Sequence, residues 1–322
     1  MEDNKNVLLS VKDLEVAYIT KDETVKAVNG VSFSLDRGET LGLVGETGAG
    51  KTTIAKSIMN ILPEPPAKVL GGEILFEGNN LLNYTEPEMR KVLGKHISMV
   101  FQDPMTALNP VKRVGWQIAE CIWLHDKCGW HEANKRAKEI FEMVGISGDR
   151  FREYPHQFSG GMKQRVVIAI ALACNPDLLI ADEPTSALDV TIQAQVLELM
   201  NDLQKKKNTA MIMITHDFGI IAQTCTKVGV VYAGEIVEYG TVDQVLRTPK
   251  HPYTKGLFEA IPRLSLDLDR LSPIRGLPPD PTNLPAGCKF APRCPYAGPE
   301  CSNPVDSRTV GDGHIVRCIK DF

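Results

Sequence analysis

The sequence lacks the features that would place the chain within a membrane or on a nucleic acid. Its longest apolar run, 166–174, is far shorter than the roughly 18 residues that a bilayer-spanning helix needs. The first residues, 1–6, have neither the basic stretch nor the apolar core of a signal peptide. A net charge of −4 leaves no excess of basic side chains for a nucleic acid. We therefore expect a cytoplasmic protein that meets a membrane only through partners and binds no nucleic acid.

Cysteines are scarce over most of the chain and gather near its end. Four of the eight are scattered through apolar or helical surroundings, where the role of a small buried hydrophobic residue is expected: Cys121, Cys128, Cys174 and Cys225. The other four are Cys288, Cys294, Cys301 and Cys318. In a reducing compartment this clustering indicates metal or redox chemistry rather than disulfides. Four thiolates suit Zn²⁺ or an iron–sulfur cluster, the paired C-x2-C spacing that favours zinc is absent, and unligated structural thiols are a third interpretation.

The same end of the chain is rich in proline. Nine prolines fall between Pro273 and Pro304, and proline interrupts helices and sheets. We therefore expect this segment to be either disordered or held by something other than a hydrophobic core. A bound metal would contribute the free energy that orders it.

A glycine-rich segment carries the clearest chemical signal. Its residues fit the pattern G-x-x-x-x-G-K-[ST]: Gly45, Glu46, Thr47, Gly48, Ala49, Gly50, Lys51, Thr52 and Thr53. The apolar run 40–44 before it predicts a buried strand, and 53–59 predicts a helix. In such a loop the backbone N–H groups converge on phosphates, Lys51 reaches the outer phosphates and the Thr52 hydroxyl holds Mg²⁺. We therefore predict a nucleotide site.

Acidic residues and a histidine follow two further apolar strands. Residues 177–181 predict a buried strand that ends on Asp182 and Glu183. Because ligands of open α/β sheets bind at these strand ends, Asp182 is suited to fix Mg²⁺ and Glu183 to accept a proton from an attacking water. A solvated pair of acids is the alternative. His216 follows the strand predicted at 210–214, and is either structural or placed to contact the terminal phosphate or orient the water.

A second glycine-rich turn, Ser159-Gly160-Gly161-Met162, leads into an apolar helix and forms another anion-binding helix end. A protein that binds one nucleotide has no obvious need for a second such turn. Two copies facing each other would explain it, with the second turn of each closing over the P-loop of the other.

The pattern of strands and helices predicts an α/β fold. Alternating apolar strands and helices indicate a mostly parallel sheet covered on both faces. Near the start, 7–11, 14–18 and 27–35 alternate like antiparallel strands, and 71–82 predicts a hairpin. About 55 residues from 103 onward have helical periodicity and form an insert between strands. One apolar helix face in this insert comprises Ala133, Ala137, Ile140, Phe141 and Val144.

These motifs, in this order, resemble an ATP-binding subunit of an ABC transporter over residues 7 to about 260. The family's Walker A, Q-loop, signature, Walker B, D-loop and switch histidine correspond to 45–53, Gln102, 159–162, 180–183, 186–189 and His216. Tyr18 stands where the family stacks an aromatic ring on adenine, with an ordinary strand tyrosine as the alternative. The chain departs from the pattern at Met162, where many members carry glutamine. We expect little effect, because the family's γ-phosphate contacts come mainly from Ser159 and Gly161.

The resemblance implies a P-loop NTPase fold with a RecA-like core, an antiparallel β subdomain, a helical signature subdomain at about 103–165 and a Cys/Pro-rich C-terminal extension. The ABC ATPase domain would span 1–262, and the extension with its four-cysteine metal site 263–322. The resemblance further implies ATP hydrolysis with Mg²⁺ held by Thr52, Gln102 and Asp182. Two subunits would sandwich two ATP molecules, with the signature residues Ser159, Gly160 and Gly161 of one subunit completing the site of the other.

Finer segments resemble the dipeptide and oligopeptide importer branch: 101–110, 154–157, 251–254 and 291–297. This implies a peripheral protein at the cytoplasmic face of the cell membrane. Its partners would be two membrane-spanning permease subunits, a second identical or homologous ATP-binding subunit and an extracytoplasmic solute-binding protein. Some members of the branch hold a [4Fe–4S] cluster in a similar tail, which implies that cluster for the four cysteines, with zinc as the alternative.

Two other functions stay open at this point. The same machinery could import another solute, an oligosaccharide or a metal chelate, because the resemblance does not fix the solute. A soluble ABC ATPase that acts on nucleic acid or the ribosome is disfavoured. The chain has one cassette, and no coiled coil separates Lys51 from Asp182.

Overall fold

The computed structural model describes residues 6–186, 188–260 and 274–321. Within these residues the chain forms two compact units. The P-loop unit consists of 9–34, 41–80 and the part from 215 onward. The signature unit consists of 6–8, 35–40 and 81–214. The predicted domain boundary at 262/263 falls outside the described residues and stays a prediction.

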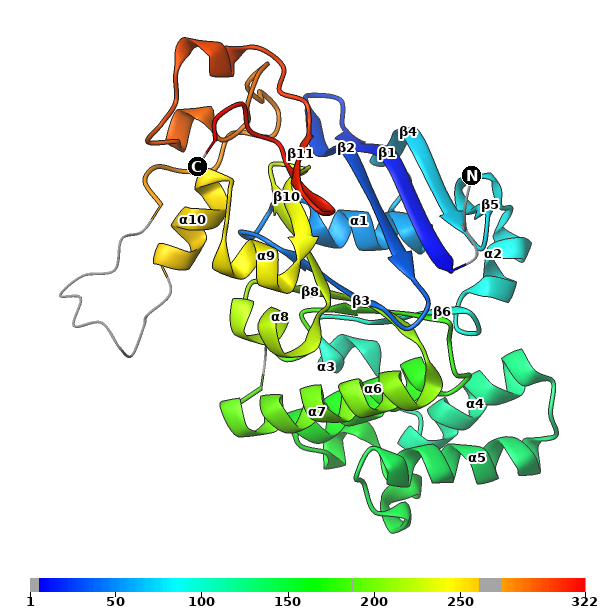
Figure 1. Cartoon of the computed structure of the whole chain (residues 1–322). Coiled ribbons are helices and arrows are strands. Elements are labelled where there is room, and N and C mark those ends of the chain that lie inside the picture. The colour runs from blue at the N-terminus through cyan, green and yellow to red at the C-terminus, as the bar shows by residue number, and fades with distance from the viewer. Residues whose placement is uncertain (1–5, 187, 261–273, 322) are drawn as a thin grey trace. The chain divides into compact units, whose positions relative to one another are not determined.

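An antiparallel sheet in the P-loop unit has the strand order β2-β1-β4-β5 (Figure 1). Its strands are β1 (Val7–Ile19), β2 (Thr24–Asp36), β4 (Ala67–Phe76) and β5 (Asn79–Asn80). The two strands predicted at 7–11 and 14–18 are one continuous strand, so this prediction was wrong. The break in the apolar alternation is a bulge at Asp13, whose φ of 46° shifts the register against β4 without ending the strand.

The P-loop unit also holds the strand that precedes the glycine-rich loop. Strand β3 (Thr40–Val44) is buried along its whole length and pairs in parallel with β9 (Lys227–Tyr232). Beyond β9 the order continues through β10 (Glu235–Thr241) and β12 (His314–Val316) to β11 (Arg308–Gly311), all antiparallel. The helices of this unit are α1 (Lys51–Ile58), α8 (Phe218–Thr224), α9 (Val242–Arg247) and α10 (Pro252–Glu259).

The signature unit is built on three parallel strands in the order β8-β7-β6. They are β6 (Ile97–Val100), β7 (Leu178–Asp182) and β8 (Ala210–Thr215), and every residue in them is buried. The helices are α2 (Glu86–Val92), α3 (Pro104–Ala107), α4 (Val114–Asp126), α5 (Trp130–Met143), α6 (Gly160–Leu172) and α7 (Val190–Lys207). Short 3-10 turns of this unit occur at Leu81–Asn83, Gly148–Arg152 and Pro155–Gln157.

Helices α4, α5 and α6 pack against one another, and α7 packs on α6 (Figure 1). Most of the face predicted from the helical periodicity turns inward, since Ala133, Ala137, Phe141 and Val144 are buried, whereas Ile140 is only half-buried. The Phe141 ring meets two other aromatic rings edge-on, with centroid distances of 5.8 and 6.3 Å. The helical insert thus has an aromatic core of its own.

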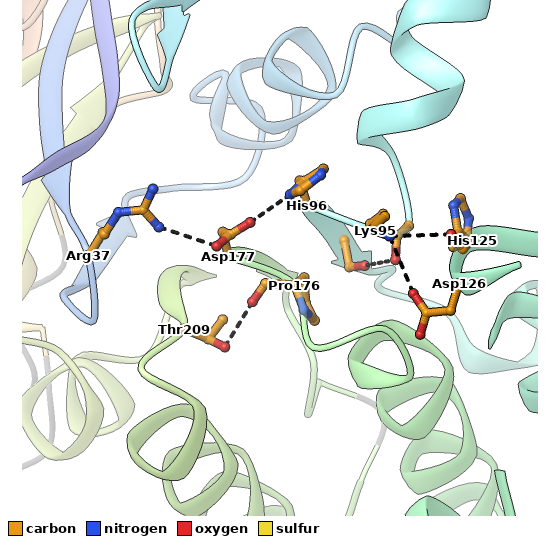
Figure 2. A network of polar contacts seen from close by, with 10 residues as sticks. Arg37, Lys95, His96, His125, Asp126, Pro176, Asp177 and Thr209 are labelled. Carbon is orange, nitrogen blue, oxygen red and sulfur yellow. Dashed lines mark hydrogen bonds and ion pairs between the residues drawn. The ribbon is translucent and has the colours of Figure 1, made fainter. Parts of the chain in front are cut away.

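A polar network ties together the segments that enter the three parallel strands (Figure 2). Asp177, which precedes β7, binds Arg37 at 3.2 Å and the Nδ1 of His96, which precedes β6, at 2.8 Å. Thr209, which precedes β8, donates to the Pro176 carbonyl at 2.9 Å. These contacts fix the amino ends of the strands, and the predicted catalytic residues of this unit follow at the opposite ends of β6 and β7.

The proline-rich segment has a hydrophobic anchor in its described part, 274–321, contrary to expectation. Phe290, Val305 and Val316 are buried, and β12 pairs with β10. Its prolines are accommodated in turns, two of which are 3-10 helices at Ala291–Arg293 and Pro299–Ser302 with proline near the first position.

In the described part of the chain, no helix combines the length and apolar character needed to cross a bilayer.

A buried polar cluster joins α10 to β10 and β12. The carboxylate of Glu238 accepts hydrogen bonds from the backbone N–H groups of Lys250 and His251 and from the imidazole of His314, at 2.7 to 2.9 Å. The His251 ring caps α10 by accepting from the Tyr253 N–H at 3.0 Å. Burial lowers the pKa of His251 to about 3, so this ring is neutral in the folded protein.

We predict that His251 makes the folded protein acid-sensitive. Because its folded-state pKa lies below the ordinary value, the unfolded chain takes up the proton first. The contribution to stability is therefore complete above pH 6.5 and is lost as the pH falls toward 3. Between pH 7 and 5 this residue should cost about 2 kcal/mol of unfolding free energy.

Denaturant unfolding of the His251→Asn variant at pH 7, 6 and 5 checks this prediction. Asparagine can still cap the helix but does not fill the buried site of the imidazole, so the variant should be less stable than the original chain at pH 7. Because asparagine does not titrate, the variant should lose most of that deficit by pH 5. Exposed His131, changed to asparagine, is the matched control. A deficit that stays constant with pH would contradict the prediction.

Candidate nucleotide-binding and catalytic site

The glycine-rich loop joins the buried strand β3 to α1 and adopts a backbone that only glycine permits. Gly48 and Gly50 have φ values of 80° and 104°. A Cβ atom on Gly45 would collide with the carbonyl oxygen of Val231, and one on Gly50 with that of Ala27. The loop is therefore held tightly against its neighbours, with its N–H groups leading into the amino end of α1. This is the backbone that a phosphate cradle requires.

The side chains of the loop are already ordered around the cradle. The ammonium group of Lys51 is buried and donates to the carbonyl oxygens of Gly45 and Glu46 at 2.8 and 3.0 Å. The hydroxyls of Tyr18 and Thr53 lie 3.4 Å apart, which places the Tyr18 ring beside the first turn of α1. Adenine stacking on Tyr18 stays a prediction.

Two residues outside the predicted site support Glu46 in the loop. Its N–H donates to the hydroxyl of Tyr253 at 3.0 Å, and its carboxylate binds the guanidinium of Arg293 at 2.7 and 3.0 Å. The Glu46 carboxylate raises the pKa of Arg293, and burial raises the pKa of Tyr253. Sequence reasoning missed both roles. Both residues lie in segments that resemble the peptide-importer branch, but nothing in their spacing linked them to the loop.

The predicted catalytic carboxylate of Glu183 is held by the Q-loop residue. Asp182 ends β7 and is almost fully buried, and Glu183 follows in the left-handed region with a φ of 46°. The Gln102 side-chain amide donates to the Glu183 carboxylate at 2.9 Å. The Glu183 N–H donates to the Ile214 carbonyl at 2.9 Å, and the Ser186 hydroxyl donates to the Glu183 carbonyl at 3.2 Å. These bonds maintain a conformation that costs a non-glycine residue roughly 1–2 kcal/mol.

The signature turn borders an open concavity. The Ser159 hydroxyl caps α6 by accepting from the Met162 N–H at 3.4 Å. A cavity of ≈ 580 Å³ lies along this turn and is lined by Ser159, Gly160, Gly161, Met162, Arg165 and Asp189, among others. Met162, the departure from the family pattern, accepts a contact from Arg150 at 3.0 Å on its sulfur. The thioether is thus part of the packing behind the turn.

The remaining predicted residues occupy the ends of other elements. His216 is exposed and follows β8, directly before Asp217, whose side chain caps α8. In the D-loop, Asp189 caps α7 by accepting from the Ile192 N–H at 3.0 Å. Ala187 of that loop lies outside the described residues. The P-loop, Tyr18 and His216 belong to the P-loop unit, whereas Gln102, Asp182, Glu183 and the signature turn belong to the signature unit.

The four C-terminal cysteines are neighbours and free thiols. The Cys288 N–H donates to the Cys301 carbonyl at 2.9 Å. Burial raises the pKa of the Cys288 and Cys294 thiols, and negative charge on Cys301 and Cys318 adds to the rise for both. However, no three His, Cys, Asp or Glu side chains of the described residues are arranged to hold a metal ion. The structure therefore lends no support to the predicted metal centre in this arrangement.

The four cysteines outside the C-terminal extension were expected to be buried, and this is confirmed for one of them. Cys174 is buried, whereas Cys121, Cys128 and Cys225 are half-buried. Burial raises the pKa of Cys225 to about 12, which keeps this thiol protonated and inert. The sulfur atoms of Cys121 and Cys174 lie 4.0 Å apart.

Comparison with known protein families gives two matches. The family described as ABC transporter matches residues 28–186. The family described as the C-terminal region of oligopeptide/dipeptide transporters matches residues 237–301, which include His251, Tyr253 and Arg293.

Curated relatives match over nearly the whole chain. The dipeptide transport ATP-binding protein DppD of Bacillus subtilis is 50% identical over 314 residues, 97% of this chain and 94% of that protein. The oligopeptide transport ATP-binding protein OppD of the same organism is 55% identical over 293 residues, 90% of this chain and 82% of that protein. The Escherichia coli OppD is 47% identical over 98% of this chain and 94% of that protein.

Solved structures show the same fold. A dimeric ATP-binding cassette, MJ0796, bound to ADP and Pi, superposes with a TM-score of 0.66 at 25% identity, covering 73% of this chain and 98% of that one. CbiO1 from Clostridium perfringens, part of an ABC transporter complex, gives 0.66 at 29% identity and covers 76% of this chain and 92% of that one. These matches confirm the predicted ABC ATPase fold. The chain belongs to the ABC transporter family, in the branch of dipeptide and oligopeptide transport ATP-binding proteins.

Proposed function

We propose that this chain is the ATP-hydrolysing subunit of a membrane importer for dipeptides and oligopeptides. The observation that carries the proposal is the Q-loop amide of Gln102 bonded to the carboxylate of Glu183, at the tip of a buried strand. Three hydrogen bonds hold Glu183 in its left-handed backbone conformation and keep its carboxylate beside the Q-loop amide. The high identity to peptide transport ATP-binding proteins supports the choice of solute.

ATP binding would use the P-loop and the strand tips. The loop N–H groups take the phosphates, and Lys51 exchanges the Gly45 and Glu46 carbonyls for the outer phosphate oxygens. The oxygen donors of Thr52, Gln102 and Asp182 suit Mg²⁺, a hard cation. Bound Mg²⁺ supplies charge neutralisation for the phosphates.

Glu183 would act as the general base. Its carboxylate is restrained by Gln102 until a change in the Q-loop releases it toward the attacking water. Such a change would link the catalytic residue to whatever the Q-loop contacts outside the chain, and His216 would orient the water or hold the terminal phosphate. Hydrolysis is then coupled to movement of the Q-loop, because the Gln102 amide both restrains Glu183 and moves with that loop.

A second ATP-binding subunit, identical or homologous, would complete each site. The cavity along the signature turn offers Ser159, Gly160 and Gly161 to a nucleotide held by the other subunit. The related cassette MJ0796 is a dimer. The further partners would be two membrane-spanning permease subunits and an extracytoplasmic solute-binding protein, with this chain peripheral at the cytoplasmic face.

We predict that Glu183→Gln leaves ATP affinity intact and lowers turnover by about 10²-fold or more, because the amide cannot accept the water proton. Single-turnover hydrolysis and equilibrium ATP binding measure the two effects separately. Glu86→Gln, a change at an exposed helix position, is the matched control, and Lys51→Ala should instead lose ATP affinity. Normal turnover in the Glu183 variant would remove this residue from the base role.

The solute is tested by reconstitution. The chain should co-purify with two membrane-spanning subunits and, in proteoliposomes with its solute-binding protein, hydrolyse ATP faster when di- or oligopeptides are added. Oligosaccharides and metal chelates should give no stimulation. Stimulation by either of these without a response to peptides would reassign the solute and leave the ATPase assignment intact.

We also propose that Cys288, Cys294, Cys301 and Cys318 hold a [4Fe–4S] cluster, with zinc as the alternative. The gathering of four thiols in a proline-rich segment supports a shared ligand.

Anaerobically purified protein should contain about four irons and four sulfides per chain and absorb in the visible range. Serine at all four positions should abolish both iron and colour, whereas serine at Cys128, outside the set, should not. One zinc without colour would establish the alternative. Protein with neither metal would leave four structural thiols.

A further inference from the structure

The C-terminal extension reaches the nucleotide loop through one arginine. The Arg293 side chain is only 4% exposed, and its guanidinium grips both carboxylate oxygens of Glu46 at 2.7 and 3.0 Å. Its remaining donors bond the Arg275 carbonyl at 3.1 Å and the Tyr232 hydroxyl at 3.4 Å. A bidentate arginine–carboxylate pair has a defined geometry, and here the guanidinium is buried while the Glu46 side chain is 29% exposed.

A second contact from the same stretch of chain acts on the same residue. Phe290 is buried, and its ring centroid lies 5.3 Å from those of both Tyr232 and Tyr253. The Tyr253 hydroxyl in turn accepts from the Glu46 N–H at 3.0 Å. The loop 288–294 therefore fixes Glu46 twice, through Arg293 at the carboxylate and through Phe290 and Tyr253 at the backbone.

The charge of Glu46 makes this contact matter for ATP. The carboxylate belongs to a loop whose purpose is to bind a polyanion, and the Glu46 carbonyl oxygen is one that holds Lys51 in place. Without compensation, its negative charge would repel phosphates bound by the same loop. Arg293 cancels that charge and holds the carboxylate on the side of the extension.

We propose that Arg293 is a positioning residue of the nucleotide site, which neutralises Glu46 and sets the affinity of the P-loop for ATP. The inference rests on the proposed ATPase function and adds to it. Because Arg293 sits directly before Cys294, displacement of the cysteine-bearing loop is transmitted to the P-loop as a change in ATP affinity. The extension is then a regulatory part of the site.

Four variants of the full chain test this assignment by equilibrium binding of a fluorescent ATP analogue. Arg293→Ala should raise Kd about tenfold, since it leaves Glu46 negative and unpaired. Glu46→Gln removes the negative charge and leaves Arg293 cationic, so by the same argument it should lower Kd, and adding it to Arg293→Ala should restore Kd to near the original value. Arg247→Ala is the matched control. Arg247 is an exposed arginine of α9 that pairs with Asp243, and its loss should leave Kd unchanged.

Kinetics and stability separate positioning from structural damage. In steady-state hydrolysis the Arg293→Ala effect should appear in KM, with kcat changed less than twofold, and the double variant should recover KM even if its melting temperature stays low. Should Arg293→Ala fail to fold, Arg293→Lys keeps the charge but loses the bidentate geometry, and it should raise Kd by less than about tenfold. Glu46→Gln then tests the charge from the other side.

Three results would overturn the proposal: an Arg293→Ala Kd equal to the original, a double variant that binds as weakly as Arg293→Ala, or weaker binding in Glu46→Gln alone. Each is interpretable only if the original chain binds ATP and Lys51→Ala does not. Absence of ATP binding in the original chain would contradict the proposed function itself, so the two failures are distinguishable.

Discussion

Completely buried parallel strands are the constraint on which the rest of the molecule depends. In the P-loop unit, β3 is buried at all five positions and delivers the glycine-rich loop at its carboxyl end. In the signature unit, β6 and β7 are equally buried and are followed by Gln102 and by Glu183. A buried strand cannot slide without exposing apolar side chains, so the residues that follow it are fixed in position. The sheet, rather than the loops, therefore positions the binding and catalytic residues that follow these strands.

The opposite ends of the strands are secured differently. In the signature unit the entering segments are tied by Asp177, which holds Arg37 and His96 at once (Figure 2). These groups are partly exposed, so each pair alone is worth little, but together they define where β6 and β7 begin. The contacts at the amino ends of the strands therefore fix their register, and the carboxyl ends carry the residues of the proposed reaction.

Local sequence patterns predicted the elements well, because periodicity and turn residues act over short distances. The P-loop, the strand-end acids and the helix face around Phe141 could all be read in this way. The bulge at Asp13 could not, since a single left-handed residue interrupts the alternation as a turn would. The contact between Arg293 and Glu46 joins residues 247 positions apart. No local rule connects such residues, and a bidentate pair looks like two ordinary charges in sequence.

Composition alone gave a wrong expectation of how the C-terminal extension is held. Its prolines do exclude long helices and strands, yet buried Phe290, Val305 and Val316, the pairing of β12 with β10 and the Arg293–Glu46 pair together dock this turn-rich segment. Phe290 also lies against the His251 ring, with centroids 5.8 Å apart, and helps to keep that imidazole out of water. The neutral His251 can then accept the Tyr253 N–H, which orients the tyrosine whose hydroxyl receives the Glu46 N–H. Burial of the extension, the protonation state of one histidine and the shape of the phosphate loop are thus parts of a single packing arrangement.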